Sequence, residues 1–222
     1  MSAKHLILAM MVAGAAGPAA AASITACGPT VCYEYDDAQA AVGLTGLPVL
    51  VGDDMQFMPT SFLASSNGAG FVTSVANFVF DRVWTPGKQE IVSLTTVEEF
   101  DYEIVNGGDV RATLYMQARS NHASSDGVSQ IWSLPIAGDS GGPQITSLTG
   151  SLLPAADFTQ PADDMRVSIQ NTLRANAGNG ELAWIQKKFT LVTTVVPVPA
   201  AVWLLGSGLG VLGLLRRRRS PA

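Results

Sequence analysis

The sequence is poor in charged and aromatic residues, and it contains only two cysteines and two histidines. Charged residues make up 14% of the 222 residues and aromatic residues 7%, whereas soluble domains are usually about 25% charged. Apolar residues reach 47%, which argues against a disordered chain. P-loop, dinucleotide-binding and HExxH zinc motifs are absent. The length allows one domain with a sizeable core rather than two.

Basic residues are scarce in the central part of the chain. Five of the 13 Lys and Arg residues are Lys4 and the four arginines at 216–219, so residues 23–215 carry eight basic and 18 acidic groups. A surface with that balance repels phosphate backbones and anionic lipid headgroups. We therefore expect no nucleic-acid partner.

The first 22 residues have the parts of a secretory signal peptide. Lys4 precedes an apolar stretch over residues 6–16 that is shorter than a membrane span. Small residues at Ala20 and Ala22 predict cleavage between Ala22 and Ser23. The Sec translocon and signal peptidase are then the expected partners. The alternative is a buried N-terminal helix.

The last 27 residues predict a single transmembrane helix. Val196 and the proline pair precede an uncharged apolar run over residues 200–215 that contains four glycines, as helices in membranes often do. The prolines break the preceding strand and extend the apolar segment toward about 20 residues. The run of four arginines keeps this end in the cytoplasm, so residues 23–195 would lie outside it.

This tail resembles a PEP-CTERM sorting signal of the proteobacterial type, and the resemblance covers residues 196–222. A proline pair, a glycine-bearing span with Trp-Leu and Gly-Ser-Gly, and a terminal arginine cluster occur together. The motif of the family is Pro-Glu-Pro, and this sequence has Val198 in place of the Glu. The residues that carry the resemblance are Pro197, Val198, Pro199, Arg216, Arg217, Arg218 and Arg219.

The resemblance implies a route for the protein. An exosortase, a membrane-embedded cysteine peptidase of Gram-negative bacteria, would recognise the tail and cut near the prolines. The precursor would sit transiently in the inner membrane, and the mature protein would reach the outer surface or the exopolysaccharide matrix. The alternative is a plain C-terminal anchor.

Residues 23–195 predict a mainly β domain, an antiparallel β-sandwich or jelly roll. Stretches rich in β-branched and aromatic residues are separated by Gly, Asn, Asp and Pro. Asn106-Gly107-Gly108 predicts a hairpin turn, and residues 176–180 predict a second one. Residues 38–44 predict a short helix. The expected strands are 47–51, 55–58, 71–80, 97–105, 110–118, 130–136, 165–174 and 182–195.

Cys27 and Cys32 predict a disulfide, because they form an even, close pair in an exported domain. The bond would pin the mature N-terminus against the first strand. A metal site is disfavoured, since no histidine lies near the two thiols. The spacing also excludes a CxxC redox centre.

Residues 138–142, Gly-Asp-Ser-Gly-Gly, match the nucleophile motif of chymotrypsin-like proteases. That chemistry needs a histidine base and an orienting aspartate. His122 is the only histidine after the expected cleavage site, and it lies in a polar segment just upstream of Ser140. We therefore interpret the motif as a glycine-rich loop and expect no catalytic residues.

The densest acidic run is a candidate calcium site. On a strand, Glu99, Asp101 and Glu103 share one face, and calcium takes carboxylate and carbonyl oxygens. The alternative is a solvated outer face opposite Phe100, Tyr102 and Ile104. No EF-hand spacing is present. Calcium is the only cofactor that the sequence suggests.

Together these patterns predict an exported cell-surface or matrix protein with a structural or polysaccharide-binding domain. Two alternatives stay open: a secreted carbohydrate-active or ester-cleaving enzyme, and a calcium-stabilised adhesin. The three tryptophans of strand-like segments, Trp84, Trp132 and Trp184, are expected in the core more often than on a sugar-binding surface.

Overall fold

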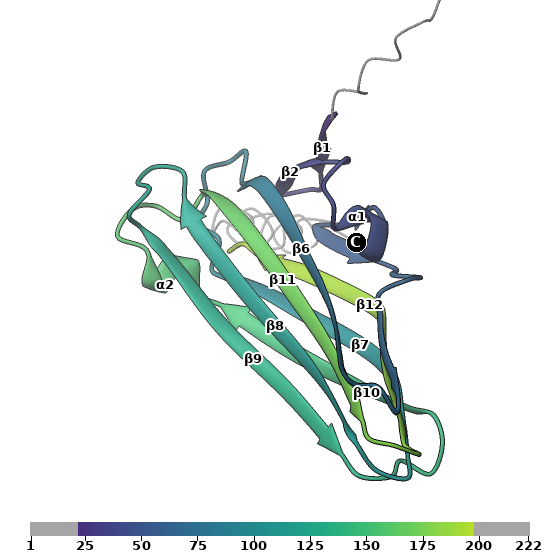
Figure 1. Cartoon of the computed structure of the whole chain (residues 1–222). Coiled ribbons are helices and arrows are strands. Elements are labelled where there is room, and N and C mark those ends of the chain that lie inside the picture. Colours follow the sequence, from purple (N-terminus) through teal and green to yellow (C-terminus); the bar gives the residue numbers. More distant parts are fainter. Residues whose placement is uncertain (1–21, 198–222) are drawn as a thin grey trace, which may run out of the picture.

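The computed structural model describes residues 22–197, which form two antiparallel sheets packed face to face (Figure 1). The predicted antiparallel β-sandwich is thereby confirmed. Almost all of the predicted signal helix and transmembrane helix lies outside the described residues. Among residues 22–197, no helix is long and apolar enough to cross a membrane.

Each sheet has six strands. The first has the order β1-β2-β6-β11-β8-β9; the second has the order β10-β7-β12-β4-β3, with β5 also paired to β12. The helices α1 (Val42–Thr45) and α2 (Pro154–Asp157) are single turns. The strands are β1 (Ser23–Cys27), β2 (Cys32–Asp36), β3 (Val49–Val51), β4 (Asp54–Phe57), β5 (Leu63–Asn67), β6 (Gly70–Trp84), β7 (Ser93–Val105), β8 (Asp109–Ser120), β9 (Gly127–Ala137), β10 (Gln144–Leu152), β11 (Asp164–Ala177) and β12 (Leu182–Val195).

The core lies between the sheets because the central strands alternate apolar and polar residues. In β11, Met165, Val167 and Ile169 are buried, while Arg166 and Ser168 between them face outward. An aromatic cluster fills one end of this layer. Its members include Phe57 and Phe78, whose ring centroids are 4.8 Å apart in an edge-to-face arrangement. Burial of this layer is the main force holding the sheets together.

All eight predicted strand segments lie in or overlap observed strands, but both predicted hairpins are wrong. β7 belongs to the second sheet and β8 to the first, so Asn106-Gly107-Gly108 carries the chain from one sheet to the other. Residues 178–181 likewise join β11 to β12 across the sandwich. A turn sequence with positive φ fixes the reversal of the chain, but not the sheet that the next strand joins.

The predicted helix over 38–44 forms only as α1, which begins later and is shorter. Strands β1, β2, β5 and β10 were not expected. They are short or polar, and they lie at or near the sheet edges, where apolar alternation is weak.

The two ends of the sandwich differ, and we name them by their contents. At the arch end, residues 68–69, 106–108, 138–143 and 178–181 each carry the chain from one sheet to the other. The disulfide end holds the β1–β2 hairpin, α1, α2 and the start of β11 (Figure 1).

Candidate functional site

A polar hollow of about 370 Å³ opens on the surface at the disulfide end. Arg82 and Trp84 come from β6, Asp164 begins β11, and His122 lies in the loop between β8 and β9. Arg82 Nε donates to Asp164 Oδ2 at 2.9 Å, and the guanidinium lies over the Trp84 ring. His122 Nε2 is 2.5 Å from Asp163 Oδ1.

The charges in this hollow are held by hydrogen bonds. Partial burial alone would raise the pKa of Asp164, but hydrogen bonds from Arg82 and Asn121 outweigh it and hold that pKa below its ordinary value. The same bond to Asp164 raises the pKa of Arg82. Sugar sites combine an aromatic ring, which packs on the apolar face of the sugar, with oxygens that accept its hydroxyl hydrogens. The hollow holds both, and the Arg82 guanidinium covers one face of the Trp84 ring.

The three tryptophans are not alike. Trp132 packs against the hydrophobic core and covers Gly150, where a side chain would clash with the indole ring. Trp84 lines the hollow, and Trp184 donates from Nε1 to Glu103 on the outer face of the second sheet. The expectation of a core position holds for Trp132 and not for the other two.

Gly-Asp-Ser-Gly-Gly forms the loop between β9 and β10 at the arch end. Ser140 Oγ accepts the N–H of Ile104 at 3.0 Å and donates to the carbonyl of Gly142 at 2.7 Å. Asp139 accepts the N–H of Gly141. The loop interpretation is confirmed. His122 lies beyond the far end of β9, roughly 30 Å away at 3.3 Å per residue, so it cannot serve Ser140 as a base.

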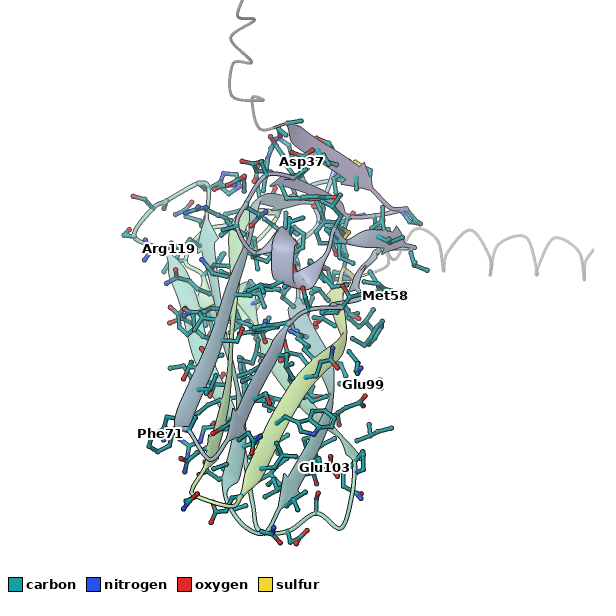
Figure 2. All side chains as sticks on the ribbon, turned by 45° about the vertical axis from the view of Figure 1, so that its right-hand side comes forward. Asp37, Met58, Phe71, Glu99, Glu103 and Arg119 are labelled. Carbon is teal, nitrogen blue, oxygen red and sulfur yellow. A yellow bond between two sulfur atoms is a disulfide. The ribbon has the colours of Figure 1, made fainter. Side chains whose placement is uncertain are left out.

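The structure does not gather the predicted calcium ligands. Glu99, Asp101 and Glu103 face outward on β7, as expected, but Figure 2 shows Glu99 and Glu103 spaced along the sheet. Asp101 pairs with Lys188 at 3.4 Å. Among the described residues, no three His, Cys, Asp or Glu side chains lie close enough to hold a metal ion.

The predicted disulfide is present. Cys27 and Cys32 are directly opposed in the β1–β2 hairpin, and their sulfur atoms are bonded. Ser23, the expected first residue after cleavage, begins β1, and Ala22 precedes it. Pro197 follows β12 and is exposed. The other predicted cleavage and sorting residues, Ala20, Val198, Pro199, Arg216, Arg217, Arg218 and Arg219, lie outside the described residues.

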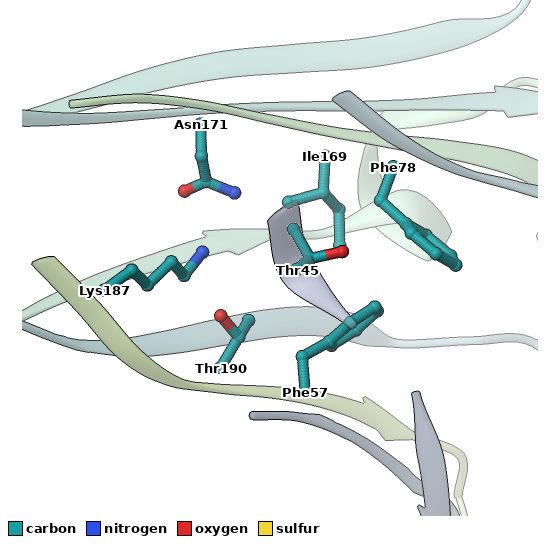
Figure 3. A pocket seen from close by; sticks show the side chains of 7 residues that line it. All are labelled: Thr45, Phe57, Phe78, Ile169, Asn171, Lys187 and Thr190. Carbon is teal, nitrogen blue, oxygen red and sulfur yellow. The ribbon is translucent and has the colours of Figure 1, made fainter. Parts of the chain in front are cut away.

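A second set of polar side chains is buried in the middle of the sandwich, between the two sheets. Glu98 on β7 and Lys187 on β12 are 0% and 1% exposed, and Lys187 Nζ is 2.6 Å from Glu98 Oε1. Asn171 on β11 is 4% exposed and faces them from the other sheet. Figure 3 shows the Asn171 amide and the Lys187 side chain pointing toward one another across the layer. We call these three residues the interior cluster.

The interior cluster was not predicted, although the positions of its residues along the strands indicate that they point inward. Glu98 has the same strand parity as Phe100, Tyr102 and Ile104, which were expected to point inward. Lys187 follows the buried Ala183 and Ile185 at alternate positions. Polar residues at inward positions of three strands are the pattern that would have found the cluster.

Comparisons with known proteins do not place this chain in a family. No family model matches, and no curated protein matches. Two solved structures, of infectious bursal disease virus strains Gx and Gt, are each 15% identical over 82% of this chain, with TM-scores of 0.30 and 0.18. The chain spans about half the length of each of those chains, covering 49% and 47%. Likeness at these TM-scores carries no information about function.

Proposed function

We propose that this protein is exported to the cell surface or extracellular matrix, and that its β-sandwich is a structural module there. The observation that carries the proposal is the Cys27–Cys32 disulfide at the start of the fold. Disulfides form and persist in oxidising compartments outside the cytoplasm. The flanking segments support the same route, because one has the pattern of a signal peptide and the other that of a sorting tail.

In this proposal the end segments determine sorting and are substrates rather than active sites. The signal peptide directs the chain through the Sec translocon, and signal peptidase cuts after Ala22. The arginines at 216–219 hold the tail at the inner membrane. An exosortase-type peptidase then cuts near Pro197 and Pro199, where proline keeps the chain extended.

The test is the intact mass of the protein from its native host, measured after cell fractionation. We expect an N-terminus at Ser23 and a C-terminus near residues 197–200, in the surface or matrix fraction. A mass that retains all four arginines, found in the inner membrane, would mean a permanent anchor. Replacing the four arginines with Glu should reduce retention of the precursor. Unchanged retention would refute their role.

A second candidate function is saccharide binding in the hollow at the disulfide end. The observation that favours it is the Trp84 ring beside Arg82, Asp163 and Asp164. Electrophoresis of the protein through gels containing the host's exopolysaccharide tests it. Retardation that is lost in Trp84→Ala and kept in Trp184→Ala supports binding at the hollow, whereas equal mobility with and without polysaccharide refutes it.

A further inference from the structure

The interior cluster contains more unsatisfied polar atoms than an ion pair explains. Glu98 Oε2 and Asn171 Oδ1 are buried and have no hydrogen-bond partner among the described residues. Asn171, Lys187 and Thr190 border a cavity of about 10 Å³, the space of roughly one water molecule. An ordinary ion pair involves Glu98 and Lys187 alone, and it leaves a buried amide oxygen unpaired, which is costly.

Burial favours the uncharged forms of the two ionisable partners. It raises the pKa of Glu98 and lowers the pKa of Lys187, because each charge is fully removed from water. A hydrogen bond from the Asn171 amide lowers the pKa of Glu98, but burial outweighs it. With the amide turned so that Oδ1 faces the carboxyl, a protonated Glu98 would donate its O–H to Asn171 Oδ1, which satisfies both orphaned oxygens with one bond. The same transfer leaves Lys187 as a neutral amine, which is nucleophilic.

We propose that Lys187 and Asn171 join through an intramolecular isopeptide bond, with Glu98 as the acid and base of the reaction. The three groups that such a bond needs lie in one place: Lys187 Nζ contacts the Glu98 carboxyl, and the Asn171 amide borders the same cavity and points toward Lys187. The bond would connect β11 of one sheet to β12 of the other, at the centre of the core.

The step needs no external reactant. Glu98 takes one proton from the Lys187 ammonium. The Nζ lone pair then forms a bond to Asn171 Cγ, while the carbonyl electrons move to Oδ1, which takes the proton from Glu98. Glu98 next moves a proton from Nζ to Nδ2. The Cγ–Nδ2 bond breaks, ammonia leaves with the bonding electrons, and the Oδ1 proton returns to Glu98 as the carbonyl re-forms. One amide becomes another, and Glu98 ends as a neutral acid.

The surroundings suit this reaction and protect its product. Phe57 and Phe78 border the same cavity and are each 3% exposed, so bulk water is kept from the bond. Condensation also replaces the ionisable amine of Lys187 by an uncharged amide, so no charge can form at this buried position. The cross-link would resist separation of the two sheets. It is independent of the export route, because it depends only on the folded sandwich.

Peptide mapping of the full chain by trypsin and mass spectrometry tests the proposal. Cleavage after Arg166, Arg174 and Lys188 separates residues 167–174 from residues 175–188. We expect these two peptides as one branched species, lighter than their sum by one ammonia molecule, with no cleavage after Lys187. Two separate, unmodified peptides from the wild-type protein would overturn the proposal. A loss of ammonia from Asn179-Gly180 within the separate peptide 175–188, with no branched species, would overturn it as well.

Variants assign the roles. Asn171→Ala and Lys187→Met should abolish the branched peptide, and Glu98→Gln should abolish it or slow its formation at least 100-fold, since general acid–base catalysis contributes about 10²–10⁴. Lys188→Arg is the matched control, because it keeps the tryptic site after residue 188, and this adjacent position lies on the exposed outer face. It should form the branched peptide at the wild-type rate. Wild-type rates in Glu98→Gln would overturn the role of Glu98.

Discussion

The two ends of the sandwich close the space between the sheets by different means. At the arch end the connections are short, and the backbone reverses through residues with positive φ such as Asn106, Gly108 and Gly138. At the disulfide end the connections over residues 85–92 and 153–163 are longer. There, carboxylates accept N–H groups from distant segments of the chain: Asp53 binds those of Thr30 and Val31, and Asp126 binds those of Thr159 and Gln160. The arch-end carboxylates Asp139 and Glu181 accept N–H groups only within their own loops.

The difference follows from chain length. A connection of two to six residues has few conformations that reach the opposite sheet, so part of its backbone adopts the left-handed region, where glycine is favoured. A longer connection can leave regular geometry, but its N–H groups then need other acceptors. Stability at the arch end should therefore depend on residue type at a few backbone positions, and stability at the disulfide end on charge.

The largest effect is expected for Gly108→Ala at the arch end. Gly108 has φ 100°, and an added Cβ would lie 2.5 Å from the backbone oxygen of Asn176. Backbone strain and steric overlap together should lower the free energy of unfolding by about 3 kcal/mol. Urea denaturation measures the change.

Gly138→Ala is the matched control for that variant. Gly138 has φ 89° in the same group of loops, but nothing lies within 4 Å of its added Cβ. Only the backbone strain remains, so we expect a loss of about 1 kcal/mol. Equal losses in the two variants would mean that close packing against β11 contributes nothing at Gly108.

A smaller effect is expected for Asp53→Ala at the disulfide end. The Asp53 carboxylate accepts the Thr30 N–H at 2.8 Å, the Val31 N–H at 3.0 Å and the Thr30 hydroxyl at 2.7 Å. Removing it leaves the Val31 N–H without its acceptor, at a cost of about 1–2 kcal/mol. Asp54→Ala is the control, because Asp54 accepts none of these bonds. An equal loss in both variants, by thermal unfolding, would show that the bonds to Asp53 do not stabilise this end.

How far the sequence predicts this fold depends on the range of the interaction. Strand alternation is local, so the long strands and the inward side of Phe100 and Ile104 could be predicted. The Cys27–Cys32 disulfide could be predicted as well, because the residues are close in sequence and the context is oxidising. Sheet membership could not, since the turn at residues 106–108 looks the same whether the chain pairs with itself or crosses to the other sheet.

The candidate sites illustrate the same limit. The hollow brings together Arg82, His122 and Asp164 from separate parts of the chain, and no short motif marks that meeting. For the interior cluster, the alternation of inward and outward side chains along each strand predicts that Glu98 and Lys187 point inward. Their contact across β7 and β12 depends on a register shifted between Lys187 and Phe189, which the sequence does not reveal.

The two ends of the sandwich should also differ in how their stability depends on pH. Hydrogen bonds outweigh the effect of burial and lower the pKa of Asp53 and Asp164, while the Thr159 N–H chiefly lowers the pKa of Asp126. All three lie at the disulfide end. Because their folded-state pKa values are lowered, they stabilise the fold above the unfolded value of about 3.9, and this contribution is lost as pH falls through the folded values.

Hydrogen exchange, corrected for intrinsic rates, should show the Thr30, Val31 and Thr159 amides losing protection at about pH 3 relative to about pH 6. The Ser140 amide, bonded to the Ile104 carbonyl at the arch end, should stay protected. Equal loss at both ends would show that acid unfolds the sandwich as one unit, and that the two ends do not differ in their dependence on charge.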